Sequence, residues 1–258
     1  MSAGNSPIRD WQGKRVWIVG ASSGIGEALA ISLHARGARV AVSARRTEVL
    51  QALAAAHSGM RAMAVDLADR RVFAAALAEL CADWGGIDLV VLSAGAYAPM
   101  RAWELDAAAI DHLLDINLRA PMAAAAQIVP VLLQQGGGAI AFVSSVAGYR
   151  GLPKAAGYGP GKAGLINFAE TLHLDLAPRG VSVFLINPGF VATPMTAAND
   201  FEMPALITPQ QAADAIIAGF ASGDFEIHFP KRFTNWLKLL RLLPYAWYFP
   251  LVRRFTKL

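Results

Sequence analysis

Three residues in the middle of the chain have the types and spacing needed to move a proton at an oxygen atom. Ser145 stands thirteen residues before Tyr158, and Lys162 follows Tyr158 by four. In a helix, residues four apart share one face, so the phenol and the ammonium group would lie close together. A nearby cation favours the phenolate, so we expect the pKa of Tyr158 to fall from its usual ~10 towards neutrality. Such a tyrosine could act as general acid or base at a carbonyl or alcohol oxygen.

A glycine-rich turn near the start of the chain predicts a site for the phosphates of a dinucleotide. The apolar run 16–19 is typical of a buried strand, and 27–36 is typical of a helix. Between them lie Gly20, Ala21, Ser22, Ser23, Gly24, Ile25 and Gly26. The glycines allow a tight turn and let the backbone approach a pyrophosphate, which would sit at the N-terminus of the helix. Strand, turn and helix together predict the start of a dinucleotide-binding unit.

Strand-like and helix-like segments alternate over most of the chain. Strands are predicted at 15–19, 39–43, 61–65, 88–92, 138–143, 181–186 and 225–229. Helices are predicted at 24–36, 47–56, 70–83, 107–134, 156–177 and 209–220, with Pro160 early in its helix. Strands separated by helices predict an α/β protein with a doubly wound parallel sheet.

These features resemble those of the short-chain dehydrogenase/reductase family over about residues 12 to 230. Further landmarks of the resemblance are Asp66-Leu67, Ser93-Ala94-Gly95, Asn117 in Asp-Ile-Asn-Leu, and Asn187-Pro188-Gly189. The resemblance implies a Rossmann-type fold and an NAD(P)-dependent oxidoreductase acting on CH–OH groups. It also implies a catalytic set of four residues: Asn117, Ser145, Tyr158 and Lys162. Tyr158 would exchange the proton, Ser145 would hold the substrate oxygen, Lys162 would bind the nicotinamide ribose, and Asn117 would support a proton-relaying water.

The same resemblance implies which residues contact the cofactor. They are Gly20, Ser22, Ser23, Gly24, Ile25, Gly26, Arg45, Arg46, Asp66, Leu67, Ala94, Gly95, Tyr158, Lys162, Pro188, Gly189, Val191 and Thr193. The chain departs from the family pattern in two places. Val19 stands where a threonine is usual, and Leu92-Ser93 stand where two asparagines are usual. These positions normally tie the cofactor loop to neighbouring strands through side-chain hydrogen bonds.

The end of the second predicted strand indicates which cofactor is preferred. An acidic residue there would accept hydrogen bonds from a ribose 2′-hydroxyl and favour NAD. This chain has Ala44 at that position, followed by Arg45 and Arg46. An arginine can hold a 2′-phosphate through charge-assisted hydrogen bonds, so we expect NADP(H) to be preferred over NAD(H). The alternative is that both arginines belong to a solvated loop, in which case no preference follows.

A mostly apolar set of residues is expected around the substrate. Besides Ser145 and Tyr158, the expected contacts are Tyr149, Leu152, Phe190 and Met195, with Phe201 and Met203 in the same wall. Few fixed charges are available there to recognise a small acid or a sugar. We therefore expect a hydrophobic, lipid-like carbonyl compound or secondary alcohol, although some of these residues could belong to the core instead.

Composition favours one domain without disulfides or metals. The 258 residues are 55% hydrophobic and 16% charged, and a chain of this length can bury a substantial core. The single cysteine, Cys81, excludes an intramolecular disulfide and fits a reducing compartment. The five histidines are scattered without the spacing of a metal site. Residues 1–5 do not have the features of a signal peptide, so a cytoplasmic protein is expected.

The C-terminal extension, 231–258, differs in charge and in residue composition from the predicted catalytic domain, 1–230. Residues 227–258 contain no acidic residue and seven basic ones: Lys231, Arg232, Lys238, Arg241, Arg253, Arg254 and Lys257. The first part reads as an amphipathic helix with one apolar face of Phe233, Trp236, Leu237, Leu240 and Leu243. Such a segment suits an anionic membrane surface, including the inner face of a membrane, but is too interrupted to span it. Packing on the body of the protein or on a partner subunit is the main alternative, and nucleic acid is not expected as a partner.

Two functions of different classes remain open at this point. The first is an NADP(H)-dependent oxidoreductase that uses Tyr158. The second is a cofactor-binding sensor or scaffold of the same fold without turnover. Because all four catalytic positions are intact, the sequence favours the enzyme, and a dehydratase or epimerase with the same residues stays possible. The resemblance also implies a homodimer or homotetramer formed through the helices at 107–134 and 156–177.

Overall fold

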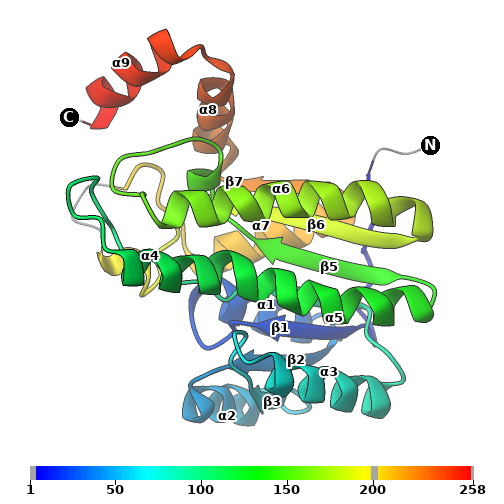
Figure 1. The fold of residues 1–258 in the computed structure, drawn as a ribbon. Coiled ribbons are helices and arrows are strands. Elements are labelled where there is room, and N and C mark those ends of the chain that lie inside the picture. Colours follow the sequence, from blue (N-terminus) through cyan, green and yellow to red (C-terminus); the bar gives the residue numbers. More distant parts are fainter. Residues whose placement is uncertain (1–3, 199–202, 257–258) are drawn as a thin grey trace.

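The computed structural model describes residues 4–198 and 203–256 and contains a seven-stranded, fully parallel sheet. The strand order is β3-β2-β1-β4-β5-β6-β7 (Figure 1). The strands are β1 (Arg15–Val19), β2 (Arg39–Ala44), β3 (Arg61–Ala64), β4 (Leu89–Leu92), β5 (Gly138–Val143), β6 (Val181–Pro188) and β7 (Glu226–Phe229). The order reverses between β1 and β4, which is where ligands bind in doubly wound sheets.

Helices cover both faces of the sheet. One face carries α1 (Gly24–His34), α2 (Thr47–Ala56) and α7 (Pro209–Ser222). The other face carries α3 (Arg70–Trp84), α4 (Ala107–Leu114), α5 (Ala120–Gln134) and α6 (Tyr158–Leu176), as Figure 1 shows. Side chains of a strand alternate between faces, so Val16 and Ile18 enter one core while Trp17 and Val19 enter the other. The predicted single-domain, doubly wound α/β fold is confirmed.

Most element boundaries agree with the sequence prediction to within two residues. The predicted helix 107–134 is the exception, because a π-helical turn at Asp115–Arg119 separates α4 from α5. By length and composition, Ala107–Gln134 is the one stretch of the described residues that could cross a membrane. It packs on the sheet instead: Ile128 and Leu132, for example, are fully buried in the core.

The C-terminal extension forms two further helices, α8 (Lys231–Leu242) and α9 (Tyr245–Thr256), which rise from the body beyond β7 (Figure 1). The prediction of one apolar face on the first helix is wrong. Phe233 and Leu237 pack against the core, whereas Trp236 is 66% exposed. Lys238 contacts the body through an ion pair with Glu226. The helix is apolar on two sides, since one side packs on the body and the other is exposed. Lys257 lies outside the described residues.

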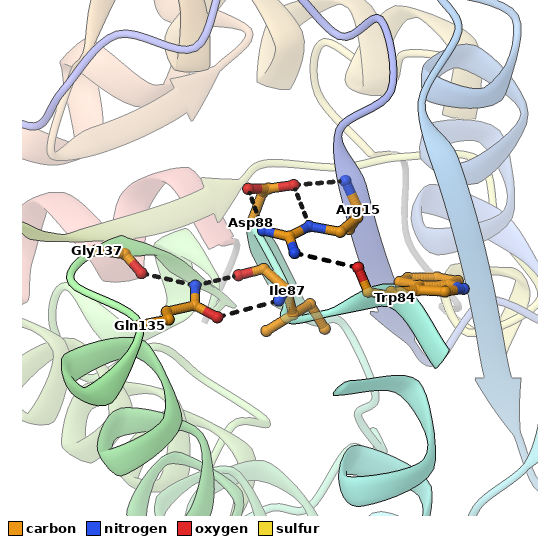
Figure 2. Close-up of polar contacts among 6 residues, drawn as sticks. All are labelled: Arg15, Trp84, Ile87, Asp88, Gln135 and Gly137. Atoms are coloured by element: carbon orange, nitrogen blue, oxygen red, sulfur yellow. Dashed lines mark hydrogen bonds and ion pairs between the residues drawn. The ribbon is translucent and has the colours of Figure 1, made fainter. Parts of the chain in front are cut away.

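A polar network fixes the amino ends of the central strands, opposite the site described below. Figure 2 shows the Arg15 guanidinium donating to both carboxylate oxygens of Asp88 at 2.9 Å. The Gln135 side chain donates to the carbonyl oxygens of Ile87 at 2.6 Å and Gly137 at 2.7 Å. Burial alone would raise the pKa of Asp88, but its hydrogen bonds with Arg15 hold the pKa below the ordinary value. The network links β1, β4 and the turn before β5.

Candidate active site

A cavity of about 460 Å³ opens at the carboxyl ends of the strands. It runs from the turn after β1, past the ends of β2 and β3, to the start of α6 and the segment after β6. The lining includes nearly every residue that the sequence assigned to a cofactor: Gly20, Ser22, Ser23, Gly24, Ile25, Arg45, Arg46, Asp66, Leu67, Ala94, Gly95, Tyr158, Lys162, Pro188, Gly189, Val191 and Thr193. Only Gly26 of that set lies outside the lining.

The glycines of the first turn are required by close approaches of the backbone. Gly20 has φ +95°, and a side chain there would collide with the backbone of Ala94. A side chain on Gly26 would collide with the carbonyl oxygen of Gly20, which explains a glycine that does not line the cavity. At Gly20 and Gly24 the turn therefore presents backbone rather than side chains to the cavity, beside the N-terminus of α1. That arrangement fits a pyrophosphate.

Backbone hydrogen bonds hold this turn in place despite the two departures from the family pattern. The amide of Gly20 donates to the carbonyl of Ser43 at 2.7 Å, and the amide of Ser93 donates to the carbonyl of Val19 at 2.8 Å. Val19 itself is buried with 1% exposure. The apolar residue at this position therefore packs in the core, while the main chain joins the turn to its neighbouring strands.

Tyr158 and Lys162 line one end of the cavity, and Ser145, which is not part of the lining, contacts Tyr158. Tyr158 is the first residue of α6, and its hydroxyl is hydrogen-bonded with that of Ser145, which follows β5. Lys162 lies one turn further along α6 and is 4% exposed. Its Nζ atom donates to the carbonyl oxygen of Val143 at 2.9 Å and lies 5.7 Å from the centre of the Tyr158 ring. Pro160 falls in the first turn of α6, where its missing N–H costs little.

The expected fall in the pKa of Tyr158 is wrong for this structure. Burial raises the pKa of Tyr158 to about 12, although the hydrogen bond with Ser145 opposes the shift. Burial also lowers the pKa of Lys162 to about 7. Attraction between a phenolate and an ammonium group favours the charged form of both. Both are removed from water, and removal from water disfavours the charged form of each. At neutral pH the phenol is therefore protonated, and the lysine is close to its midpoint of titration.

Asn117 lies in the π-helical turn and is fully buried. Its Nδ2 atom donates to the carbonyl oxygens of Ala96 at 2.8 Å and Leu113 at 2.9 Å. A Cβ atom on Gly95 would lie 3.1 Å from Asn117 Oδ1 and 3.6 Å from Lys162 Nζ, so these two groups lie close to the same glycine. The extra residue of a π turn often occurs at functional sites. Here the turn directs the amide of Asn117 towards the segment after β4 and the catalytic end of the cavity.

The predicted substrate residues are divided between the cavity and the core. Met195 lines the cavity and is 38% exposed, whereas Tyr149, Leu152 and Phe190 do not line it. Tyr149 is 7% exposed and donates its hydroxyl hydrogen to Glu226, so the structure places it in the core rather than in a substrate wall. Phe190 packs against Phe233 of α8, with 5.7 Å between ring centres.

Phe201 and Met203 are the other two residues of the predicted substrate wall. Phe201 lies outside the described residues, and Met203 is half-buried.

Two residues near the catalytic set were missed by the sequence reasoning. The ring of Tyr97 meets the ring of Tyr158 edge-on, with 5.1 Å between centres. Ser144 donates its hydroxyl hydrogen to the carbonyl of Lys162 at 2.9 Å. The available signal was adjacency, because Ser144 precedes Ser145 and Tyr97 follows Gly95 by two residues. Among residues 4–198 and 203–256, no group of three or more His, Cys, Asp or Glu side chains could hold a metal ion.

Comparisons with known proteins identify the family of the chain. The family model described as short chain dehydrogenase matches residues 14–203. An uncharacterized oxidoreductase of Myxococcus xanthus is 35% identical over 231 residues, covering 88% of this chain and 91% of that protein. An uncharacterized oxidoreductase of Staphylococcus epidermidis is 31% identical over 201 residues, covering 78% and 87%.

A solved structure is similar in fold. It is a short-chain dehydrogenase from Streptomyces avermitilis with a TM-score of 0.77 and 24% identity, covering 88% of this chain and 92% of that one. The glycine-rich turn in the cavity lining, the Tyr158–Lys162 pair on α6 and the match over residues 14–203 lead to one assignment. The chain belongs to the short-chain dehydrogenase/reductase family and is an NAD(P)-dependent oxidoreductase.

Proposed function

We propose that the protein transfers a hydride between NADP(H) and a carbonyl compound or secondary alcohol, with Tyr158 as the general acid or base. The observation that supports this most is the hydrogen bond between the hydroxyl of Ser145 and that of Tyr158, which lines the cavity. Two hydroxyls that contact each other there can both reach one substrate oxygen. The bound cofactor supplies or accepts the hydride, and the protein supplies position and the proton.

The proton step follows from the state of each side chain. At neutral pH Tyr158 is protonated, because burial raises its pKa to about 12. It can therefore donate its proton to a carbonyl oxygen held by Ser145, which is the direction of reduction. In the reverse direction Tyr158 must accept a proton from an alcohol. A positive charge on Lys162 would stabilise the phenolate, which is formed by proton donation in reduction and is the form required to accept a proton in the reverse direction.

The preference for NADP(H) is supported by the charges at the far end of the cavity. Arg45 and Arg46 line it, beyond the end of β2, and both are exposed. Arg46 Nη2 donates to the carbonyl oxygen of Ser22 at 3.0 Å and to its hydroxyl at 2.9 Å. Arg46 therefore supports the first turn, which leaves Arg45 as the residue we assign to the 2′-phosphate.

A hydrophobic substrate is supported by where charges lie along the cavity. The charged residues of its described lining are Arg45, Arg46, Asp66 and Lys162, and the first three surround the proposed adenosine end. At the catalytic end the described lining is largely apolar, with Ile116, Ala120, Pro194 and Met195. Such a wall suits an alkyl or lipid-derived chain better than a sugar or a small acid.

We place this activity beside a membrane surface in the cytoplasm, because lipid-like carbonyl compounds concentrate in bilayers. A homodimer or homotetramer through α5 and α6 is the expected assembly from the family resemblance. The second candidate function is a cofactor-binding sensor or scaffold without turnover. The presence of Asn117, Ser145, Tyr158 and Lys162 together favours the enzyme over this alternative.

The first experiment is titration of the purified protein with NADPH and NADH, followed by ketones of increasing chain length. We expect tighter binding of NADPH and a kcat/KM that rises with chain length. Faster turnover of small polar ketoses than of long-chain ketones would contradict the hydrophobic substrate. Binding of NADPH without turnover of any carbonyl compound or alcohol would favour the sensor.

A further inference from the structure

The two C-terminal helices expose an unusual concentration of large apolar side chains. We call residues 231–256, which form α8, α9 and the turn between them, the C-terminal hook (Figure 1). Among the described residues, seven of the fourteen large hydrophobic side chains that are clearly exposed lie in the hook. They are Trp236, Leu239, Leu242, Tyr245, Trp247, Phe249 and Phe255, each at least 51% exposed. A concentration of exposed apolar side chains on this scale indicates an interaction site.

The hook is anchored to the body, so this exposure is not that of a loose tail. Arg150 donates from Nη1 to the carbonyl oxygens of Leu240 at 3.0 Å and Leu243 at 2.6 Å, at the C-terminal end of α8. Its guanidinium group also lies 3.9 Å from the centre of the Tyr248 ring. The Tyr248 hydroxyl in turn donates to the carbonyl of Gly151 at 2.7 Å.

A second set of contacts fixes the start of the hook. Lys238 donates to Glu226 at 2.6 Å, and Glu226 also accepts hydrogen bonds from Tyr149 and Asn187. Phe233 packs against the core on the same side. The anchors therefore face the body, and of the exposed aromatic residues Tyr245 also contacts it, with its ring centre 4.7 Å from the Arg150 guanidinium carbon. Trp236, Trp247 and Phe255 are each at least 66% exposed.

The hook and the catalytic residues share one segment of chain. Arg150 and Gly151 contact the hook directly, and Tyr149 bonds to Glu226, the partner of Lys238. All three follow Ser145 by only a few residues. The same segment leads directly to Tyr158 at the start of α6. A partner that binds the hook would therefore lie beside the segment that carries the catalytic hydroxyls.

The charge of the hook decides between the possible occupants of this surface. Residues 227–258 contain no acidic residue, and Lys231, Arg232, Arg241, Arg253 and Arg254 are exposed. A two-fold contact between two copies would bring the same basic surface against itself, and like charges would repel. An anionic lipid surface attracts the charges and accepts the aromatic rings at the level of its head groups.

We propose that the C-terminal hook docks the protein on the surface of an anionic bilayer, with its aromatic side chains in the interfacial region. The hook does not span the bilayer, since each of its helices is only 12 residues long. Docking would present the catalytic segment to hydrophobic carbonyl compounds dissolved in that bilayer. This part of the inference rests on the proposed function. The bilayer is thus the partner of the hook, and it also holds the lipid-like substrate of the enzyme.

The test is flotation of the full-length protein with vesicles of phosphatidylcholine alone or mixed with anionic phosphatidylglycerol. We expect binding to the anionic vesicles only, weakened by salt. Trp236→Ser with Trp247→Ser should lower the partition coefficient by about a hundredfold, because each of the two buried aromatic rings contributes about one order of magnitude. The matched control is Trp103→Ser, which removes a tryptophan that is 78% exposed outside the hook and should leave binding unchanged.

A second pair of variants tests the charges. Arg253→Glu with Arg254→Glu should weaken binding by at least about fivefold per charge removed. Arg70→Glu with Arg71→Glu reverses two adjacent exposed arginines at the start of α3 and should have little effect. NADPH binding and the unfolding midpoint of each variant report whether it is folded.

Several outcomes would overturn the proposal. The first is no binding to anionic vesicles at low salt, and the second is equal loss of binding in the hook and control variants. The third is a solution oligomer that dissociates on Trp236→Ser with Trp247→Ser, which would assign the surface to a second copy. Vesicle binding without turnover of any carbonyl compound would leave docking in place and reject the proposed function instead. If the hook delivers substrate, the tryptophan variants should slow turnover of a ketone held in vesicles but not of a water-soluble one.

Discussion

The hydroxyl group of Ser144 donates a hydrogen bond of 2.9 Å to the backbone carbonyl of Lys162. This bond joins the end of β5 to the first turns of α6 across eighteen residues of sequence. A second bond runs the other way, from Lys162 Nζ to the carbonyl of Val143. The two bonds hold Ser145 and Tyr158 at a fixed separation, although they belong to different elements.

The segment after Ser145 packs closely against α6, and this contact can be tested at Gly148. A Cβ atom there would lie 2.7 Å from the backbone carbon of Lys162 and 2.9 Å from the amide nitrogen of Ala163. Backbone cannot move aside cheaply, so Gly148→Ala should displace the segment after Ser145 from α6. We expect a lower unfolding midpoint and a reduced kcat, measured by thermal unfolding and steady-state kinetics.

Gly159→Ala is the matched control for this substitution. A Cβ atom at Gly159 meets its nearest atom at 3.4 Å, which is ordinary contact, and alanine favours the helix by about 1 kcal/mol. We expect unchanged or higher stability and nearly normal kcat. If Gly148→Ala were as active and stable as Gly159→Ala, the packing of this segment on α6 would not position Ser145.

Tyr158→Phe tests the proton transfer. Removing the hydroxyl removes the proposed acid, so kcat should fall by about 10²–10⁴, while the Kd for NADPH should stay nearly unchanged. Rapid mixing and cofactor fluorescence would measure the two quantities. Tyr97→Phe keeps the ring that meets Tyr158 edge-on and should retain most activity. Substantial turnover by Tyr158→Phe would remove this residue from its assigned role.

The two arginines after β2 should respond differently to removal. Arg45→Ala should weaken NADPH by about 10–100-fold and leave NADH nearly unchanged, since a hydrogen bond to a charged group contributes about 1.5–3 kcal/mol. Arg46→Ala should weaken both cofactors, because its side chain supports Ser22 of the first turn. Isothermal titration with each cofactor measures the difference, and Arg71→Ala is a control at a distant exposed arginine. Equal losses with Arg45→Ala would show that it does not contact the 2′-phosphate.

Local patterns were enough to predict the sheet and the cofactor end of the cavity. The apolar runs, the glycine-rich turn and the alternation of strands with helices each depend on residues that are close together in the sequence. Parallel strands then bring their carboxyl ends together at one edge of the sheet. The π turn around Asn117 could not be predicted in this way. The stretch 115–119 contains no proline or glycine that would mark it. Its cause is tertiary, since Asn117 bonds to Ala96 after β4.

Burial and a contact with β7 explain the other two differences from the sequence-based expectations, which concern the pKa of Tyr158 and the apolar face of α8. The spacing of Tyr158 and Lys162 correctly placed them together, but spacing carries no information about desolvation, which sets both pKa values here. The face of α8 was predicted from helical periodicity alone. The Lys238–Glu226 ion pair turns a charged residue towards the body and leaves Trp236 exposed, and periodicity cannot anticipate a partner on β7.

The lowered pKa of Lys162 makes a prediction about stability and pH. The pKa falls from its ordinary 10.5 to about 7 on folding because the amine is buried. Between these values the unfolded chain binds more protons than the folded one, so this residue makes stability rise with pH across that window. Lys162→Met removes the effect. Its free energy of unfolding relative to wild type should be highest near pH 6 and should decline by about 1.4 kcal/mol per pH unit between pH ~7 and ~10. The loss of the bond to Val143 lowers the whole curve by about 1–3 kcal/mol without changing its slope. Urea unfolding at several pH values gives the comparison, with Lys231→Met at an exposed position as the control. A difference between Lys162→Met and wild type that stayed constant from pH 6 to pH 10 would show that burial does not lower the pKa of Lys162.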